Sequence, residues 1–201
     1  MRKIKILHVT FDMAIAGTEQ VIKQLVENTD PESFETSIIC IDGKIGALGN
    51  ELVKCGIEIN TLKRGASGLD FQLVSNLKSH IKTNNIDIIH CHQYTPYIYG
   101  LFASLGTSRP VIFTEHGRFY PDSYKWKRII LNPILSLFTS SIVAISGATA
   151  QALSKYENFP KRKIQVIYNG IKNIPPASGS ILELKAELCI GPQAEVMGTI
   201  S

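Results

Sequence analysis

The segment IKILHVTF at residues 4–11, followed by GTEQVIKQLVEN at residues 17–28, decides the fold. The first segment is an apolar run rich in branched residues, which is typical of a buried strand. The second segment places Val21, Ile22 and Val26 at helical spacing. These residues therefore predict a strand, a loop and a helix at the start of the chain.

The same alternation continues along the chain. Further strands are predicted at residues 34–41, 57–62, 86–91, 111–114, 142–145 and 164–167. Segments with helical periodicity lie between most of them. Near-continuous apolar strands joined by crossover helices predict an α/β fold, a Rossmann-like doubly wound parallel sheet covered on both faces.

Composition excludes several classes of protein. Hydrophobic residues make up 44% of the 201 residues and charged residues 19%, which is typical of a globular protein. The net charge of +4 is spread over short clusters, so no basic stripe indicates a nucleic-acid partner. The four cysteines form no C-x-x-C pair, and the apolar stretch at residues 129–145 is interrupted by Asn132 and Pro133. We therefore expect a cytoplasmic protein with reduced thiols and no membrane span.

The end of the chain predicts a second domain. Residues 1–171 contain the complete alternation, and residues 172–180 have the composition of a linker. A short helix is expected at residues 181–188 and a new apolar strand at residues 194–200. Residues 172–201 are therefore interpreted as a linker and the first elements of a truncated C-terminal domain.

In open parallel sheets, ligands bind at the carboxyl ends of the strands, so the loops there are candidate sites. The first loop leads to Gly17, Thr18 and Glu19 without the G-x-G-x-x-G spacing of dinucleotide-binding proteins. It still opens a helix whose N-terminus favours a phosphate, while Gly17 permits close approach and Glu19 can accept from sugar hydroxyls. The alternative is an ordinary helix start, with Thr18 as its cap.

Two histidine segments follow the fourth and fifth main strands. His90 and His92 lie two residues apart and share a face of their strand. No further ligand is apparent near them in the sequence, so we expect no metal site, and a purely structural histidine is the alternative. The second segment contains His116, Gly117 and Arg118. A neutral imidazole there can hydrogen-bond a sugar hydroxyl, and Arg118 can pair with a phosphate or carboxylate; the alternative is a structural turn.

Two weaker signals come later. Ser146 opens a helix and on physical grounds alone is an N-cap. Asn169 and Gly170 follow a short strand, and alone they indicate only a tight turn.

Taken in order, these segments resemble the retaining glycosyltransferases of the GT-B fold, the "group one" family. The resemblance covers residues 4–201 and depends on five landmarks together, none of which is specific alone. One departure is Ala16, where the family often has the first of two glycines. The landmarks are the Gly17-x-Glu19 loop, the D-I-I-H-x-H segment at residues 87–92, the T-x-H-G turn at residues 114–117, Ser146 and the V-I-x-N-G-I segment at residues 166–171.

The resemblance implies the N-terminal, acceptor-side domain of an enzyme that transfers a sugar with retention from a nucleotide-sugar donor to a saccharide or lipid-linked acceptor. His116 would be the catalytic residue, because it contacts the transferred sugar. No metal or other cofactor is expected, and this segment alone should be inactive. The implied substrate-binding residues are Gly17, Thr18, Glu19, His92, Gly117, Arg118, Ser146 and Asn169.

The implied role is cell-surface polysaccharide or glycolipid synthesis. The basic and aromatic residues at 125–128, followed by an apolar helix, suggest peripheral contact with an anionic membrane at the inner face of the plasma membrane; a buried core helix is the alternative. Other functions considered are a sugar-nucleotide epimerase of similar fold and a non-enzymatic flavodoxin-like nucleotide-binding module. A dehydrogenase is disfavoured because the glycine fingerprint is missing.

Overall fold

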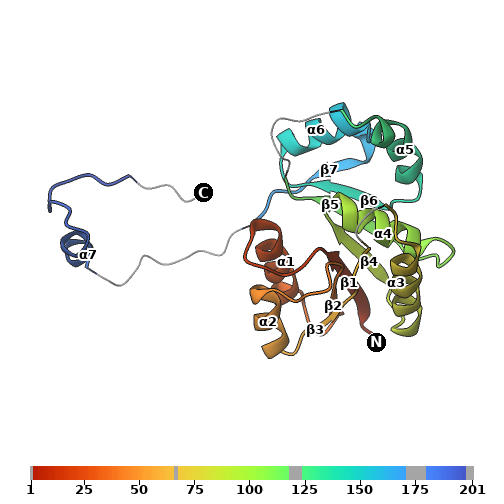
Figure 1. The fold of residues 1–201 in the computed structure, drawn as a ribbon, viewed down its shortest axis with the longest axis horizontal. Helices are drawn as coiled ribbons and strands as arrows, with labels where there is room; N and C mark the ends of the chain where they lie inside the picture. Colours follow the sequence, from red (N-terminus) through yellow and green to blue (C-terminus); the bar gives the residue numbers. More distant parts are fainter. Residues whose placement is uncertain (1, 66–67, 118–123, 171–179, 198–201) are drawn as a thin grey trace. The chain divides into compact units, whose positions relative to one another are not determined.

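A computed structural model describes residues 2–65, 68–117, 124–170 and 180–197. The strands of the protein within these residues form one seven-stranded parallel sheet. The strand order is β3-β2-β1-β4-β5-β6-β7. This is the doubly wound, Rossmann-like sheet that the alternating pattern predicts (Figure 1). The strands are β1 (Ile4–Thr10), β2 (Phe34–Cys40), β3 (Glu58–Thr61), β4 (Ile88–His92), β5 (Val111–Glu115), β6 (Ser141–Ala144) and β7 (Ile164–Val166).

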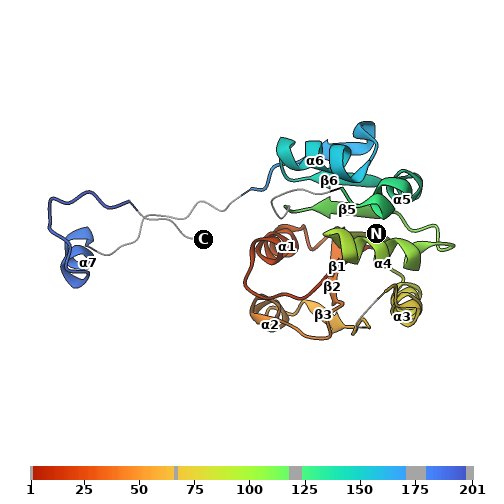
Figure 2. The same cartoon turned by 45° about the horizontal axis from the view of Figure 1, so that its top comes forward.

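Helices cover the two faces of the sheet. In Figures 1 and 2, α1 (Gly17–Asn28) and α2 (Ala47–Lys54) lie on one side, and α3 (Phe71–Thr83) and α4 (Tyr94–Ser104) lie on the other. Each pair of helices packs against the strands and contributes to a separate cluster of buried apolar side chains. The remaining helices of the main unit are α5 (Trp126–Leu137), α6 (Gly147–Glu157) and the short 3-10 helix η1 (Lys161–Lys163).

The alternation of β1 divides its side chains between these faces. Leu7 and Val9 are fully buried in the cluster formed with α3 and α4. Because neighbouring side chains on a strand point to opposite faces, His8 and Thr10 point toward the face that carries α1 and α2. Polar side chains in an otherwise apolar strand therefore gather on one face.

The sheet reverses its winding at β1. β2 and β3 follow on one side of β1, and the chain then returns to place β4 on the other side. A crevice at the carboxyl ends of two such strands is the usual ligand site of an open α/β sheet. The topology therefore directs attention to the ends of β1 and β4.

The chain separates into two compact units, Met1–Asn169 and Gly170–Ser201. The expected helix of the second unit is present as α7 (Ile181–Glu187). The strand expected at residues 194–200 is wrong for residues 194–197, which are in no strand, and its remainder lies outside the described residues. Within the described residues, no helix has the length and apolarity that crossing a bilayer requires.

Candidate functional site

Four histidines meet where the sheet reverses. His8 comes from β1, His90 and His92 from β4, and His116 directly follows β5. His8 Nδ1 lies 2.9 Å from His92 Nε2, and His92 Nδ1 lies 2.8 Å from His116 Nε2. His90 is outside this chain of bonds, since its Nε2 lies 2.8 Å from Thr114 Oγ1. The rings of His90 and His92 are nevertheless in contact, with centroids 4.2 Å apart.

Burial keeps these histidines neutral. It lowers the pKa of His8 and of His116 from 6.5 to about 4, because the imidazolium form loses its hydration. Burial also lowers the pKa of His90 and His92 well below 6.5, and the neighbouring histidines lower it further. At neutral pH each imidazole therefore carries one proton and presents one donor and one acceptor nitrogen.

Two buried polar atoms at this place have no hydrogen-bond partner among the described residues. They are His116 Nδ1 and Thr10 Oγ1, and Thr10 is the last residue of β1. Buried polar groups in proteins are nearly always paired, so unpaired ones call for an explanation. Both lie at the carboxyl edge of the sheet, where a ligand with hydroxyl groups would supply the missing partners.

The start of α1, directly after the loop that follows β1, is joined by a hydrogen bond to the carboxyl end of β4. Thr18 Oγ1 accepts a hydrogen bond of 3.0 Å from Gln93 Nε2, which joins the start of α1 to the end of β4. Gly17 is exposed, and a Cβ there would meet nothing within 4 Å, so the ligand-free fold does not require a glycine at this position. Glu19 is buried, and its pKa is raised mainly by that burial. Thr18 does not cap α1, whose N-cap is Ala16.

Gln93 is a candidate site residue that the sequence pattern did not indicate. Its backbone has φ 69° and ψ 164°, a region that residues other than glycine rarely occupy, and such strain costs about 1–3 kcal/mol. The backbone N–H of Gln93 donates to the Thr114 carbonyl over 2.9 Å. Strained backbone of this kind is concentrated at functional sites, so Gln93 joins the candidate residues. Its side chain reaches Thr18 only because of the strand order, which the sequence does not disclose.

His92, predicted to bind substrate, is completely buried, and both of its nitrogens are bonded to other histidines. In this arrangement His116, and not His92, presents a ring nitrogen without a partner among the described residues. The expectation that no third metal ligand lies near His90 and His92 fails, because β1 brings His8 next to them, and nitrogens of the three residues lie within 4.8 Å of one another. A metal ion there would have to displace the hydrogen bonds that already engage His92.

The other described sequence candidates follow the carboxyl ends of β5, β6 and β7, which are successive strands of the sheet. Gly117 directly follows His116 and is exposed. Ser146 follows β6 and is the N-cap of α6, where its Oγ accepts from the Thr149 N–H over 3.1 Å. Asn169 is exposed after β7. Arg118 lies outside the described residues.

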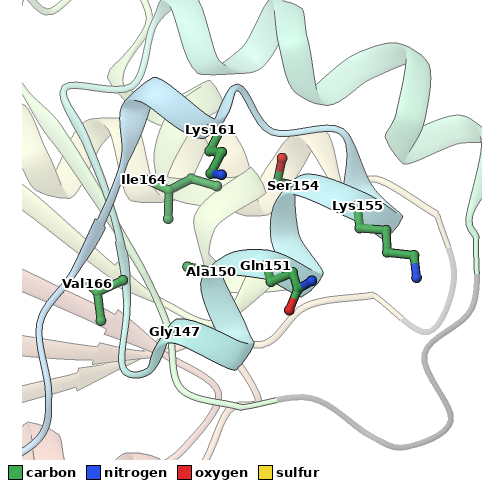
Figure 3. A pocket seen from close by; sticks show the side chains of 8 residues that line it. All are labelled: Gly147, Ala150, Gln151, Ser154, Lys155, Lys161, Ile164 and Val166. Atoms are coloured by element: carbon green, nitrogen blue, oxygen red, sulfur yellow. The ribbon is translucent and has the colours of Figure 1, made fainter.

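A pocket of about 500 Å³ lies elsewhere, between α6 and β7 (Figure 3). Gln151 and Lys155 reach it from α6, Lys161 from η1 and Val166 from β7. None of the histidines lines it. It is therefore separate from the hydrogen-bonded site at the end of β1 and β4.

Helix α5 has an unusual orientation. Its fully buried residues are polar: Asn132 accepts from Tyr94 Oη over 2.7 Å and donates to the Glu157 carbonyl over 2.8 Å, and Ser136 is fully enclosed as well. Leu135 packs against the core and Ile129 is half-buried, so one side of the helix is enclosed, as the core-helix alternative expects. The other large apolar side chains of the helix are exposed. These side chains are Trp126, Ile130, Leu131, Ile134 and Leu137, followed by Phe138.

Arg128 in the same helix has internal partners. Its Nη1 lies 2.6 Å from Glu157 Oε1, and its guanidinium carbon lies 3.6 Å from the centre of the Tyr94 ring. Lys125 and Lys127 are exposed. Of the basic residues that open the helix, these two lysines are therefore available to an external partner.

The fold defines a class of protein, the doubly wound α/β domain, whose sheet here reverses at β1. Comparison with known proteins defines the family. The model for glycosyltransferase family 4 matches residues 15–172, and the chain belongs to that family. Its fold matches about half of each GT-B structure compared, as its motifs predict.

Two individual relatives are also described as glycosyltransferases. A capsular polysaccharide biosynthesis glycosyltransferase of Staphylococcus aureus is 29% identical over 177 residues, covering 84% of this chain and 48% of the relative. A UDP-Gal:alpha-D-GlcNAc-diphosphoundecaprenol alpha-1,3-galactosyltransferase of Escherichia coli is 26% identical, covering 84% and 45%. The crystal structure of Anabaena HepE with UDP-glucose superposes with a TM-score of 0.72 at 20% identity, covering 92% of this chain and 50% of that one. The chain thus spans about half the length of these relatives.

Proposed function

We propose that the complete protein transfers a sugar from a nucleotide-sugar donor to a saccharide or lipid-linked acceptor, and that this domain supplies the acceptor side of the cleft. Family membership supports transfer over the epimerase and the flavodoxin-like module. The donor is proposed as a uridine diphosphate sugar, since HepE was crystallised with UDP-glucose and the E. coli relative is described as using UDP-Gal. The same relative's diphosphoundecaprenol acceptor supports a lipid-linked acceptor here.

One observation carries the proposal. A neutral, largely buried imidazole lies at the carboxyl edge of the reversal with one ring nitrogen, His116 Nδ1, lacking a partner among the described residues. Such a nitrogen can bind a hydroxyl of the transferred sugar without bringing a full charge into the cleft. The open space at Gly17 and the N-terminus of α1 favour the donor diphosphate nearby.

The test uses the complete protein with radiolabelled UDP-sugars and an undecaprenyl diphosphate-linked saccharide. His116→Ala should lower turnover by about 100-fold, within the range for loss of a group that stabilises developing charge. The control is His80→Ala, because His80 lies on α3, on the opposite face of the sheet. Turnover of His116→Ala within a factor of two of the His80→Ala rate would contradict the proposal.

Retention and metal independence are part of the same proposal. Retention is tested by NMR of the anomeric proton of the product, and an inverted configuration would refute it. Activity that survives extensive dialysis against EDTA supports metal independence. Loss of activity that Zn²⁺ restores would instead assign the nitrogens of His8, His90 and His92 to a metal ion.

We further propose that the exposed apolar side of α5 rests on an anionic membrane. Trp126, Ile130, Ile134 and Leu137 recur at helical spacing and form one stripe, and at least half of each side chain is exposed. Lys125 and Lys127 flank Trp126 in the sequence and add positive charge at the start of the stripe. An apolar face with flanking lysines is the composition of an interfacial helix, and a lipid-linked acceptor would be presented at that surface.

A further inference from the structure

We propose that His8, His92 and His116 form one hydrogen-bonded relay, in which His8 and His92 are positioning residues that hold His116 as the tautomer with a bare, accepting Nδ1. The hydrogen-bond distances of 2.9 Å and 2.8 Å join the three rings end to end. The inference rests on the proposed role of His116, but its central measurement does not depend on catalysis.

The relay has only two neutral arrangements. Each hydrogen bond needs one proton between two nitrogens, and each neutral ring carries one proton. If His116 Nε2 donates to His92 Nδ1, then His92 Nε2 donates to His8 Nδ1, and all three rings are protonated on Nε2. In the opposite arrangement all three are protonated on Nδ1. The tautomers of the three residues are therefore coupled.

The two ends of the relay differ, and this difference selects between the two arrangements. His116 Nδ1 is buried without a partner among the described residues, whereas His8 Nε2, at the other end, is not one of the buried atoms that lack a partner there. A buried N–H without an acceptor is rarer in proteins than an acceptor without a donor. The arrangement with Nε2 protonated leaves a bare nitrogen at this position and is therefore favoured. It presents an acceptor to the ligand, and a sugar hydroxyl is the donor that fits it.

His8 controls the relay from its other end. Its Nδ1 accepts the hydrogen bond that His92 Nε2–H donates in the favoured arrangement. Without that acceptor, the His92 N–H would be left buried and unpaired, since His92 is completely buried. His92 then gains by moving its proton to Nδ1 and donating to His116 Nε2. This shift forces the His116 proton onto Nδ1, and the acceptor offered to the ligand becomes a donor.

Two substitutions at position 8 separate this effect from packing. In His8→Asn the side-chain amide oxygen lies close to the position of Nδ1 and still accepts. In His8→Leu the side chain fills the space but accepts no hydrogen bond. The control is His90→Gln: His90 touches the His92 ring but bonds to Thr114, outside the relay, and glutamine can retain that bond.

The experiment is histidine-ring ¹⁵N NMR of the 201-residue chain at neutral pH. We expect Nε2 to be protonated in His8, His92 and His116 of the wild type, and in His92 and His116 of His8→Asn and His90→Gln. In His8→Leu both His92 and His116 should be protonated on Nδ1. Unchanged tautomers in His8→Leu would overturn the relay. The wild-type spectrum is a test that needs no variant to fold, because His116 protonated on Nδ1 there would overturn the proposal as well.

Kinetics of the complete protein then connect the relay to function. We expect His8→Leu to lower kcat/KM about tenfold, the value of roughly one hydrogen bond to the ligand, and His8→Asn to stay near the wild type. Reversed tautomers with unchanged transfer would support the relay and overturn the role of His116. Normal tautomers in a complete protein that transfers no sugar would support the relay and count against the proposed function alone.

Discussion

Acid should destabilise this domain through its buried histidines. The pKa of His8 falls from 6.5 to about 4 on burial, so between these pH values the unfolded chain binds a proton that the folded chain does not. The associated stability is fully present above pH 6.5, decreases as the pH falls, and is lost by about pH 4. For His8 alone, the difference between the two pKa values is worth about 3 kcal/mol. A domain of this size has a free energy of unfolding of about 5–15 kcal/mol, so the effect is large.

Urea unfolding followed by circular dichroism between pH 4.5 and 7.5 measures this dependence. Each proton bound only by the unfolded chain contributes a slope of about 1.4 kcal/mol per pH unit. His90, His92 and His116 contribute in the same direction, because burial lowers the pKa of each. Glu19 opposes them, since burial raises its pKa. The contributions of the histidines need not add, since protonating one histidine of a connected group disfavours protonating the next. Asp70 and Asp87 have a pKa below the usual range, so they titrate below this window.

His8→Asn provides the comparison. It removes one titrating group and keeps an acceptor for His92, so its slope should be lower than that of the wild type by up to one proton. A wild-type free energy of unfolding that is flat between pH 4.5 and 6.5 would refute the reasoning, because it would mean that the buried rings accept protons as readily as free histidine does. Equal, steep slopes for the two proteins would exclude His8 as a contributor.

Three further predictions concern other parts of the domain. Replacing Ile130 and Ile134 together with serine should abolish sedimentation with anionic vesicles while leaving unfolding unchanged; sedimentation equal to the wild type, or equal recovery with neutral vesicles, would contradict membrane contact. Glu157→Gln should lower the free energy of unfolding by about 1–3 kcal/mol in urea titrations, because its ion pair with Arg128 is mostly buried, and an unchanged midpoint would refute this. Gly100→Ala should cost about 1–3 kcal/mol in the same assay, since a Cβ would overlap the Cys91 sulfur, whereas Gly147→Ala, with open space around its Cβ, should be neutral.

The sequence predicts most of the fold because periodicity is a local property. The run at residues 4–11 and the helical spacing of residues 17–28 are sufficient for β1 and α1, and repetition of that unit implies a parallel sheet. The cluster of histidines could not be predicted in the same way. His8 lies in an apolar strand 84 residues before His92, and only the strand order makes them neighbours. The apolar pattern of β1 predicts a buried strand, and it does not indicate that His8 within it belongs to a polar cluster.

Helix α5 illustrates a different limit. The sequence shows the apolar residues of α5, and their periodicity predicts that they form a stripe along the helix. Periodicity does not predict whether that stripe faces the core or the solvent. Asn132 bonds to Tyr94 and to the Glu157 carbonyl inside the domain. These two hydrogen bonds contribute about 1 kcal/mol each, which is less than enclosing several large apolar side chains would contribute. The exposed apolar side of α5 is therefore not explained by Asn132 alone.

The placement of neutral histidines at the reversal of the sheet has a physical logic. A cleft that receives a diphosphate and a sugar needs polar atoms, but fixed charges buried behind it would be costly and would respond to every change in the ligand's charge. Neutral imidazoles avoid both problems, since each can satisfy its neighbour and, in the proposed relay, only the last ring is offered to a ligand. The cost is that one nitrogen at the end of the series remains unpaired until a ligand arrives, and His116 Nδ1 is that atom. Ligand binding should therefore rigidify His116 more than Thr10, whose hydroxyl can rotate to find a partner in either state.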